Sequence, residues 1–596
     1  MTPVNDLAPV HADVPSTGPA WKAPLAIVAI ALGLRFIPGW IAPFTLVHFI
    51  FLGVGPVVGV LGLLVWWALN RRVRGREKWL GLVLAVGILV SSFVIAHPTM
   101  SQFMVTYGLV LMLAVFLATL LLTREMAWAR RRWLLILSLA VALWPWSLVR
   151  QDGQVGTLSP ELSARWKPTA EDLFLESRSA SPVSSPAAEE AIAQSDWPGF
   201  RGPDRDGKAR GARFDVDWES HPPRELWRRR VGPAWSSFAV AGDLVFTQEQ
   251  RGDQETVVAY SLNDGREIWA LGTPERFEEP ASGAGPRATP AFDGGTVYAL
   301  GARGTLLAID AAGGALSWRR SLVEDVEAPL PVWGFTSSPL VVGRAVIVFA
   351  GASDGRSVVA YHRDTGDLLW SAGEGRLSYS SVHGATIGGL DQVLMASEFG
   401  LQAFDPATGE LWWEHRWPIP DGSRMVQPAM LDGGGTIVLG TGFGEGSRRL
   451  SVARAASGEW SVTEVWTSRF LKPYFNDLVC HKDTCYGFDN KIFTAIGIDD
   501  GERRWKGGRY GNGQVLLVPE MDLLLVLTEQ GEVVLVEATP EEHRELARLQ
   551  AVEGKTWNHP VISQGKLLVR NAEEAACFEL PVADPLASLE AHDPPL

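Results

Sequence analysis

Two patterns of apolar and polar residues divide the chain. The first 150 residues contain five apolar runs, near 23–40, 44–69, 79–96, 103–122 and 133–149. Each run has about 17 to 26 residues, enough to cross a hydrocarbon layer of roughly 30 Å as a helix, and there are too many of them for a cleavable signal peptide. Beyond residue 196, short β-prone runs alternate with bends rich in Gly, Asp and Asn, which is typical of strands joined by tight turns. The pattern predicts an all-α transmembrane bundle of five helices followed by an all-β domain.

The β-rich part repeats one motif, in which two β-prone residues precede a polar bend with Gly, an apolar residue and Trp. Clear copies are "VVAYSLNDGREIW" (257–269), "LLAIDAAGGALSW" (306–318), "VVAYHRDTGDLLW" (358–370), "LQAFDPATGELWW" (401–413) and "FTAIGIDDGERRW" (493–505). A weaker copy (450–466) has an insertion, and the copy at 533–547 lacks the Trp. The copies end 39 to 53 residues apart, at Trp269, Trp318, Trp370, Trp413, Trp466, Trp505 and Ala547. This period predicts the four-stranded blades of a β-propeller, because no blade can bury its faces alone.

The last blade is expected to combine both ends of the β-rich part. The segment "RELWRRRVG" (224–232), which contains Trp227, resembles an outer strand with no inner strands before it. The run 559–580 supplies three strands and then stops. Pairing the two gives seven complete blades and one composite blade, eight in all, and leaves no open sheet edge.

Polar residues recur where each blade's inner strand begins, beside the central channel. They are Ser237, Thr289, Ser338, Ser381, Gln427, Asn476, Asn512 and His559. These side chains could form a polar ring at one mouth of the channel. Alternatively, they are strand-entry residues that bond the local backbone.

Charge distribution predicts the orientation in the membrane. The loops 70–78 and 123–132 hold nine Lys and Arg, whereas the turns 38–43 and 97–102 hold none. Basic loops stay in the cytoplasm, so the N-terminus is expected inside and the propeller outside, which in a bacterium is the periplasm. We divide the chain into a cytoplasmic N-terminus (1–22), a membrane domain (23–149), a linker rich in Ser, Ala, Pro and Glu (150–196), the propeller (197–581) and a C-terminal tail (582–596).

Three ionisable residues fall near the outer ends of the predicted spans: Arg35, His48 and His97. Such groups are candidates for function, for example beside a quinone headgroup. The plainer account is that Arg35 snorkels and that the histidines lie in the interface.

Composition narrows the classes of partner. Residues 1–150 carry 12 Lys and Arg against four acidic residues, while the whole chain has a net charge of −14, so the remainder is strongly acidic. This charge argues against nucleic acid as a ligand, because phosphate binding needs a positive surface. Of the three cysteines, Cys480 and Cys485 could face each other across a hairpin and form a disulfide or stay as buried thiols, and Cys577 is expected in the core.

The bend-and-tryptophan repeat resembles that of pyrroloquinoline quinone (PQQ) propellers over residues 197–581. "DWPGFRGPDRDG" (196–207) is similar to the segment that precedes the first blade in bacterial PQQ-like propellers, and "KTWNHPV" (555–561) is similar to their closing blades. The resemblance implies that the blade-end tryptophans dock between blades. They are Trp227, Trp269, Trp318, Trp370, Trp413, Trp466 and Trp505.

Two branches of the family share this repeat. Quinoprotein dehydrogenases, including a membrane-bound glucose dehydrogenase with five N-terminal spans, hold PQQ with calcium. The lipoprotein propeller of the outer-membrane barrel assembly machinery (BamB-like) is non-catalytic. Here the short repeat spacing leaves little room for a cofactor site, and Asp477 and Glu398 do not belong to a repeated set of calcium ligands. No metal site or catalytic residue is predicted, and His383, His481 and His559 are interpreted as structural.

We therefore expect a bacterial inner-membrane protein whose periplasmic propeller binds or scaffolds envelope proteins. The alternative is a PQQ-dependent dehydrogenase that oxidises a sugar or alcohol and passes electrons to membrane quinone. The lipid bilayer and envelope proteins are the expected partners, and the oligomeric state is left open.

Overall fold

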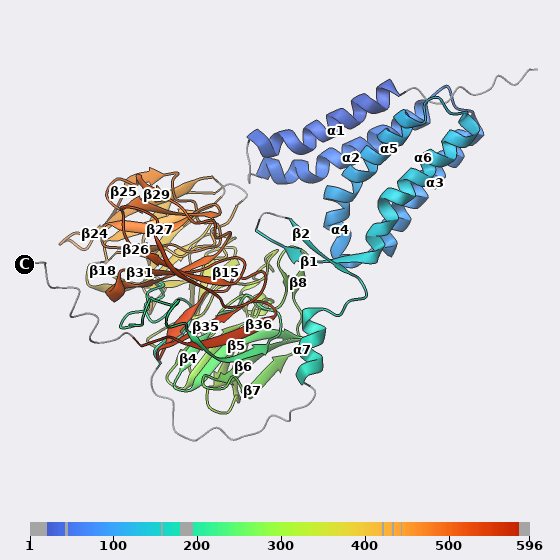
Figure 1. Ribbon diagram of the computed structural model, residues 1–596. Helices are drawn as coiled ribbons and strands as arrows, with labels where there is room; N and C mark the ends of the chain where they lie inside the picture. The colour runs from blue at the N-terminus through green and yellow to red at the C-terminus, as the bar shows by residue number, and fades with distance from the viewer. Residues whose placement is uncertain are drawn as a thin grey trace, which may run out of the picture. The chain divides into compact units, whose positions relative to one another are not determined.

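The computed structural model describes residues 21–41, 46–156, 159–178, 195–419, 422–431, 434–442 and 444–582. The chain divides into two compact units, one made of Met1–Gln154 with Ser159–Lys167 and the other of Val155–Leu158 with Pro168–Leu596. Figure 1 shows a helical first unit and a second unit built from strands. The predicted order of an N-terminal helical region followed by an eight-bladed propeller is confirmed.

The first unit consists mainly of long apolar helices (Figure 1). They are α1 (Lys22–Ile41), α2 (Leu46–Leu69), α3 (Gly75–Ile95), the continuous helix formed by η1 (Pro98–Met100), α4 (Ser101–Phe103), η2 (Met104–Gly108) and α5 (Leu109–Leu122), and α6 (Trp128–Leu143), which ends in η3 (Trp144–Leu148). Within the described residues, four helices are long and apolar enough to cross a membrane, the fourth being Pro98–Leu122. The fifth predicted run is also helical, but α6 has only 16 residues and its first turns carry three arginines.

Close packing of α1 on α2 depends on glycine. A side chain at Gly55 would place its Cβ 2.8 Å from the carbonyl oxygen of Ala31, and one at Gly59 would lie 2.7 Å from the Ala31 Cβ. Small residues at such spacing let membrane helices approach closely. At the basic-loop end, Glu77 of α3 accepts hydrogen bonds from the Trp128 indole at 2.8 Å and from Arg132 at 2.7 Å, both on α6.

Short elements follow the long helices in the sequence and precede the propeller blades. Strands β1 (Val149–Gln154) and β2 (Pro160–Ala164) form a hairpin in the first unit. Helix α7 (Ala170–Arg178) belongs to the second unit, where Glu171 accepts from the amide of Gly252 at 2.8 Å and pairs with Arg276 at 3.0 Å. These contacts attach α7 to the first blade.

The second unit contains eight four-stranded antiparallel sheets, one per blade. Blades 1 to 4 are β4 (Ala239–Ala241), β5 (Leu244–Arg251), β6 (Gln254–Ser261) and β7 (Glu267–Thr273); β10 (Ala291–Asp293), β11 (Thr296–Leu300), β12 (Thr305–Asp310) and β13 (Leu316–Ser321); β14 (Leu340–Val342), β15 (Ala345–Ala352), β16 (Arg356–His362) and β17 (Leu368–Ala372); and β18 (His383–Ile387), β19 (Leu390–Ala396), β20 (Gly400–Phe404) and β21 (Leu411–Arg416).

Blades 5 to 8 continue the same order. They are β22 (Ala429–Met430), β23 (Thr436–Thr441), β24 (Gly446–Arg454) and β25 (Trp460–Ser468); β26 (Val479–His481), β27 (Thr484–Asp489), β28 (Ile492–Gly497) and β29 (Arg503–Lys506); β30 (Gln514–Val518), β31 (Leu523–Leu527), β32 (Glu532–Glu537) and β33 (Glu545–Gln550); and β34 (Val561–Ser563), β35 (Lys566–Arg570), β36 (Glu574–Glu579) and β3 (Arg224–Arg230). Between blades lie the hairpin β8 (Glu278–Glu279) and β9 (Gly283–Ala284) and helix α8 (Leu322–Val326), and within blade 7 the turn η4 (Pro519–Met521) joins β30 to β31.

The composite eighth blade is confirmed. Strand β3 pairs with β36, with Trp227 opposite Cys577. The sheet order β3-β36-β35-β34 puts a strand from before blade 1 at the outer edge of the last blade. Cys577 is buried in this blade, and burial raises the pKa of its thiol to about 12.

Six of the seven blade-end Trp residues lie against the bend of the following blade. The indole of Trp318, for example, donates to the carbonyl oxygen of Arg363 at 2.8 Å, and a Cβ on Gly366 would lie 2.8 Å from its ring. Trp227, Trp269, Trp370, Trp466 and Trp505 make equivalent bonds to carbonyls, at Leu262, Ala311, Pro406, Ile498 and Thr539. Trp413 differs, because it donates to the side chain of Gln392 and its neighbour is the weak copy of the motif.

The missing Trp at Ala547 has a structural reason. Ala547 lies on β33, the outer strand of blade 7. The adjacent blade 8 has no bend between β36 and β3, because these strands are far apart in sequence. A Trp at 547 would therefore have no bend on which to dock.

Candidate functional site

Strand-entry residues of neighbouring blades are linked by hydrogen bonds around the central channel. The amide of Ser237 donates to Thr289 Oγ1, that of Thr289 to Ser338 Oγ and that of Ser338 to Ser381 Oγ, each at 2.9 Å. With its side-chain amide oriented to satisfy both polar atoms, Gln427 accepts from the Ser381 amide at 2.8 Å. The partners are thus backbone amides of the preceding blade rather than local ones.

Two residues outside the predicted ring continue this chain of bonds. The amide of Gln427 donates to Asp477 Oδ1 at 2.6 Å, the amide of Asp477 to Gln514 Oε1 at 3.4 Å, and Gln514 Nε2 to the carbonyl oxygen of Trp557 at 2.9 Å. Ser237 Oγ donates to the carbonyl oxygen of His559 at 2.6 Å and closes the circle. We call this circle the girdle; it links all eight blades.

The predicted Asn476 and Asn512 lie beside the girdle but take no part in it. Asn476 Oδ1 accepts from the nearby amide of Tyr474 at 2.9 Å, and the amide of Asn512 donates to Glu529 at 3.1 Å. The signal for Asp477 was present in the sequence, because it occupies the third position of its strand entry, as the serines of blades 1, 3 and 4 do. Gln514 lies one position later, so no fixed spacing indicated it.

The segment that resembles the lead-in of PQQ-like propellers (196–207) contacts the inner strands of several blades. Residues 197–209, which we call the plug, pair with the free edges of inner strands: Trp197 bridges Val240 of β4, and Lys208 bridges Leu517 of β30. Arg201 and Arg205 both have positive φ, 63° and 55°, a region that non-glycine residues rarely adopt. This backbone directs both arginines into the ring.

The two arginines contact the girdle on different blades. Arg201 pairs with the buried Asp477 of blade 6 at 3.1 Å and donates to the carbonyl oxygen of Leu478 at 2.9 Å. Arg205 donates to the carbonyl oxygens of Ser338 and Pro339 of blade 3, both at 2.9 Å. The plug thereby connects blades on different sides of the channel.

Electrostatics in the channel depend on burial. Burial acts to raise the pKa of Asp477, but the charge of Arg201 and the hydrogen bond from His559 outweigh it, so this pKa lies below its ordinary value. Burial lowers the pKa of His559, which therefore bonds Asp477 at 3.1 Å as a neutral ring. Burial, together with Arg205 and Arg201, lowers the pKa of His383 to about 3.

Aromatic residues that precede the inner strands contact one another. Trp557 lies 4.7 Å from Trp235 and 4.8 Å from Phe475, measured between ring centroids. Trp333 and Tyr379 form a second pair at 4.9 Å. All but Trp333 stand two positions before a girdle residue, so the aromatic layer follows from the same strand geometry.

The two carboxylates considered as calcium ligands, Asp477 and Glu398, have partners within the described structure. In the part of the chain that the structure describes, no group of three or more His, Cys, Asp or Glu could hold a metal ion. Asp477 is occupied by Arg201, His559 and the Gln427 amide. Glu398 accepts from the amides of Arg376 and Leu377. These carboxylates already serve as acceptors for the protein's own donors.

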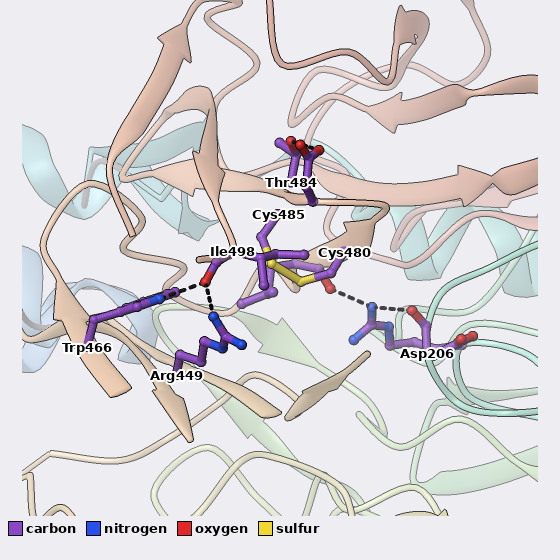
Figure 2. Close-up of a disulfide and its surroundings, with 10 residues drawn as sticks. Asp206, Arg449, Trp466, Cys480, Thr484, Cys485 and Ile498 are labelled. Carbon is purple, nitrogen blue, oxygen red and sulfur yellow. Dashed lines mark hydrogen bonds between the residues drawn. A yellow bond between two sulfur atoms is a disulfide. The ribbon is translucent and has the colours of Figure 1, made fainter. Parts of the chain in front are cut away.

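A disulfide joins Cys480 and Cys485 across the β26–β27 hairpin, with 4.1 Å between their Cα atoms (Figure 2). Figure 2 shows that the carbonyl of Ile498, beside the disulfide, accepts from Trp466 at 2.7 Å and from Arg449 at 3.0 Å. His481 is the last residue of β26, and its Nε2 is hydrogen-bonded to Asp522 at 2.5 Å.

Each of the three ionisable residues of the helical unit has contacts within the described helices. Arg35 is buried, and its guanidinium lies 5.6 Å from the ring of Tyr107 and 3.5 Å from the carbonyl oxygen of Thr106. His48 stacks on Phe49 at 5.7 Å. His97 bonds Thr99 at 2.9 Å and caps the turn η1.

Comparison with known proteins agrees with this architecture. Residues 253–507 and 397–584 match the family model for PQQ-like repeats described as outer membrane protein assembly factor BamB. The chain belongs to this family. No curated protein matches the chain.

Solved structures of similar proteins have low identity. BamB from Moraxella catarrhalis is 15% identical with a TM-score of 0.45, and the alignment covers 60% of this chain and 100% of that one. A quinohemoprotein alcohol dehydrogenase from Pseudomonas putida is 13% identical with a TM-score of 0.46, covering 67% and 84%. A second such enzyme, from Comamonas testosteroni, is 12% identical with a TM-score of 0.45, covering 66% and 82%.

Proposed function

We propose that this protein is a non-catalytic propeller that binds or scaffolds envelope proteins from a membrane anchor. The observation that carries the proposal is the occupied channel, where Arg201 of the plug is paired with Asp477. The plug and the girdle engage Asp477 and the strand-entry hydroxyls, which would otherwise be available to a cofactor or substrate. Binding through rim loops remains available, because loops can vary while the blades stay fixed.

We also propose that the anchor lies in a bacterial inner membrane, with a cytoplasmic N-terminus and a periplasmic propeller. The nine Lys and Arg of the two basic loops support a cytoplasmic N-terminus. The propeller lies outside when α6 crosses the membrane as a fifth span after the four long apolar helices. Alkaline phosphatase, which is active only outside the cytoplasm, should be active when fused after Arg150. The same reporter fused after Arg72, in the first basic loop, is the matched control and should be silent. The reverse pattern would invert the topology.

The binding role can be tested at the rim. A photo-crosslinking amino acid at Val332, which is 77% exposed in the loop between blades 2 and 3, should capture discrete envelope proteins in living cells. Val465, which is 45% exposed on an outer strand, is the matched control and should capture much less. Equal or absent crosslinking at both positions would contradict a rim-based scaffold.

The alternative, a PQQ-dependent dehydrogenase, makes a different prediction. Purified full-length protein is incubated with PQQ and calcium and then assayed for dye reduction with sugars and alcohols. We expect neither stoichiometric uptake of PQQ nor dye reduction. Uptake together with substrate-dependent reduction would replace the scaffolding proposal by an oxidoreductase.

A further inference from the structure

A cleft of about 460 Å³ lies where the plug leaves inner strands uncovered. The plug pairs with β4 and β30, whereas the cleft is lined by the inner strands of blades 3, 4 and 5. Apolar side chains, including Leu340, Met430 and Leu431, form part of its wall, and Arg205 and His383 contribute polar groups. Pockets of this volume accept small organic ligands.

Arg205 is a buried cation whose hydrogen bonds go to carbonyls. Its terminal nitrogens bond the carbonyl oxygens of Ser338 and Pro339, and its Nε has no hydrogen-bond partner among the described residues. No ion pair joins Arg205 to a carboxylate of the described chain, in contrast to Arg201, which has Asp477. A buried guanidinium is costly unless an anion compensates it.

His383 adds a second unused group. The residue is only 1% exposed, and its Nδ1 has no partner in the described part of the protein. Because burial and the two arginines lower its pKa to about 3, the ring stays neutral at physiological pH and can donate one hydrogen bond.

The other charged residues that line the cleft are three carboxylates, Asp204, Asp206 and Asp391, and one arginine, Arg210. Asp206 pairs with Arg210 at 2.6 Å and lies 3.8 Å from Lys208, and Asp204 pairs with Arg210 at 2.8 Å. Asp391, at the exposed rim, accepts from Thr386 at 2.6 Å. None of these carboxylates is ion-paired with Arg205 in the described part of the chain, so the charge at the buried end is that of the Arg205 guanidinium.

We propose that this cleft binds the carboxylate of a small ligand, with the anion at Arg205 and His383 and an apolar group against Leu340 and Leu431. A free organic acid and the carboxy terminus of a peptide share this chemistry. The site is independent of the rim loops, so the inference stands whether or not the scaffolding role is correct.

The probe for a test is isovalerate, with the neutral isostere isovaleramide as its control, titrated into full-length protein by calorimetry at pH 7. We expect isovaleramide to bind at least about tenfold more weakly, because a charge-assisted hydrogen bond is lost. Tetrapeptides ending in leucine, with a free or an amidated carboxy terminus, distinguish the sources. Binding of the free peptide alone indicates a chain terminus, and binding of isovalerate without either peptide indicates a small acid.

Variants separate this site from non-specific binding. Leu431→Trp narrows the cleft at a partly exposed position and should abolish isovalerate binding. Leu368→Trp, at a position 47% exposed on an outer strand, is the matched control and should bind normally. Arg205→Gln should weaken binding by about tenfold or more. Equal binding of acid and amide, unchanged binding by Leu431→Trp, or no binding of isovalerate and peptides would overturn the proposal.

Discussion

Contact between Trp318 and Gly366 gives a quantitative test of how the blades are joined. Gly366 has a φ of 73°, and a Cβ there would lie 2.8 Å from the Trp318 ring. Gly355, in the same blade, has a φ of 76° but no atom within 4 Å of the corresponding Cβ. Alanine at either position is therefore strained in the backbone, whereas only alanine at 366 also displaces the indole of the neighbouring blade.

The two variants should differ by the cost of that displacement. Alanine in the left-handed region costs about 1 to 2 kcal/mol, which is the whole effect expected for Gly355→Ala. Gly366→Ala adds about 1 to 3 kcal/mol for overpacking against the indole. The expected total for Gly366→Ala is about 2 to 5 kcal/mol in the free energy of unfolding.

Urea unfolding of the full-length protein, followed by circular dichroism of the β-sheet signal, measures both losses. Hydrogen exchange adds a local readout, because Gly366→Ala should increase exchange in β13 and β16 on the two sides of the contact. Equal losses for the two variants would refute the view that the indole–glycine contact holds neighbouring blades together.

Three further predictions concern the channel and the hairpin of blade 6. The folded pKa of His383, about 3, lies below its unfolded value of 6.5, so its contribution to stability is present above pH 6.5 and is lost as the pH falls towards 3. His383→Gln should therefore reduce the stability difference between pH 7 and pH 5 by about 2 kcal/mol in urea titrations, and an unchanged difference would contradict a neutral buried ring. Arg201→Met should cost about 3 to 5 kcal/mol because it leaves Asp477 charged and buried, and the double variant with Asp477→Leu should recover part of that loss; additive losses would argue against a coupled pair. Thiol labelling in non-reducing denaturant should modify Cys577 but not Cys480 or Cys485. Reduction of the disulfide should lower the free energy of unfolding by about 2 kcal/mol, because the loop it closes is short. Labelling of all three cysteines would exclude the disulfide.

The sequence was most informative where local chemistry repeats. The bend glycines and blade-end tryptophans predicted the blade number, because the motif recurs in most blades at a nearly constant spacing. The composite blade could be predicted because Trp227 carries the same motif without inner strands before it. The lack of Trp at position 547 became explicable only from the strand order of blade 8.

The channel was less predictable. Girdle residues of blades 1 to 5 stand two positions before the inner strand of their blade. Gln514 is instead the first residue of its inner strand, and its longer side chain reaches the girdle from there. The plug has no periodicity, and the pairing of Arg201 with Asp477 joins residues 276 positions apart through a turn with positive φ. Non-local ion pairs of this kind leave no signal in a single sequence.

The pairing of β3 with β36 also constrains how the protein is made. The guanidinium of Arg224 meets Glu579 across 355 positions of sequence, so the circle of blades cannot close until almost the whole chain has been synthesised. Until then, blades 1 and 7 each present an apolar face that the eighth blade will later cover, and such surfaces invite aggregation and chaperone binding. A chain that stops short of β36 is left as an open arc, which proteases can recognise by the same exposed surface. The pairing of β3 with β36 therefore distinguishes a full-length propeller from a truncated one.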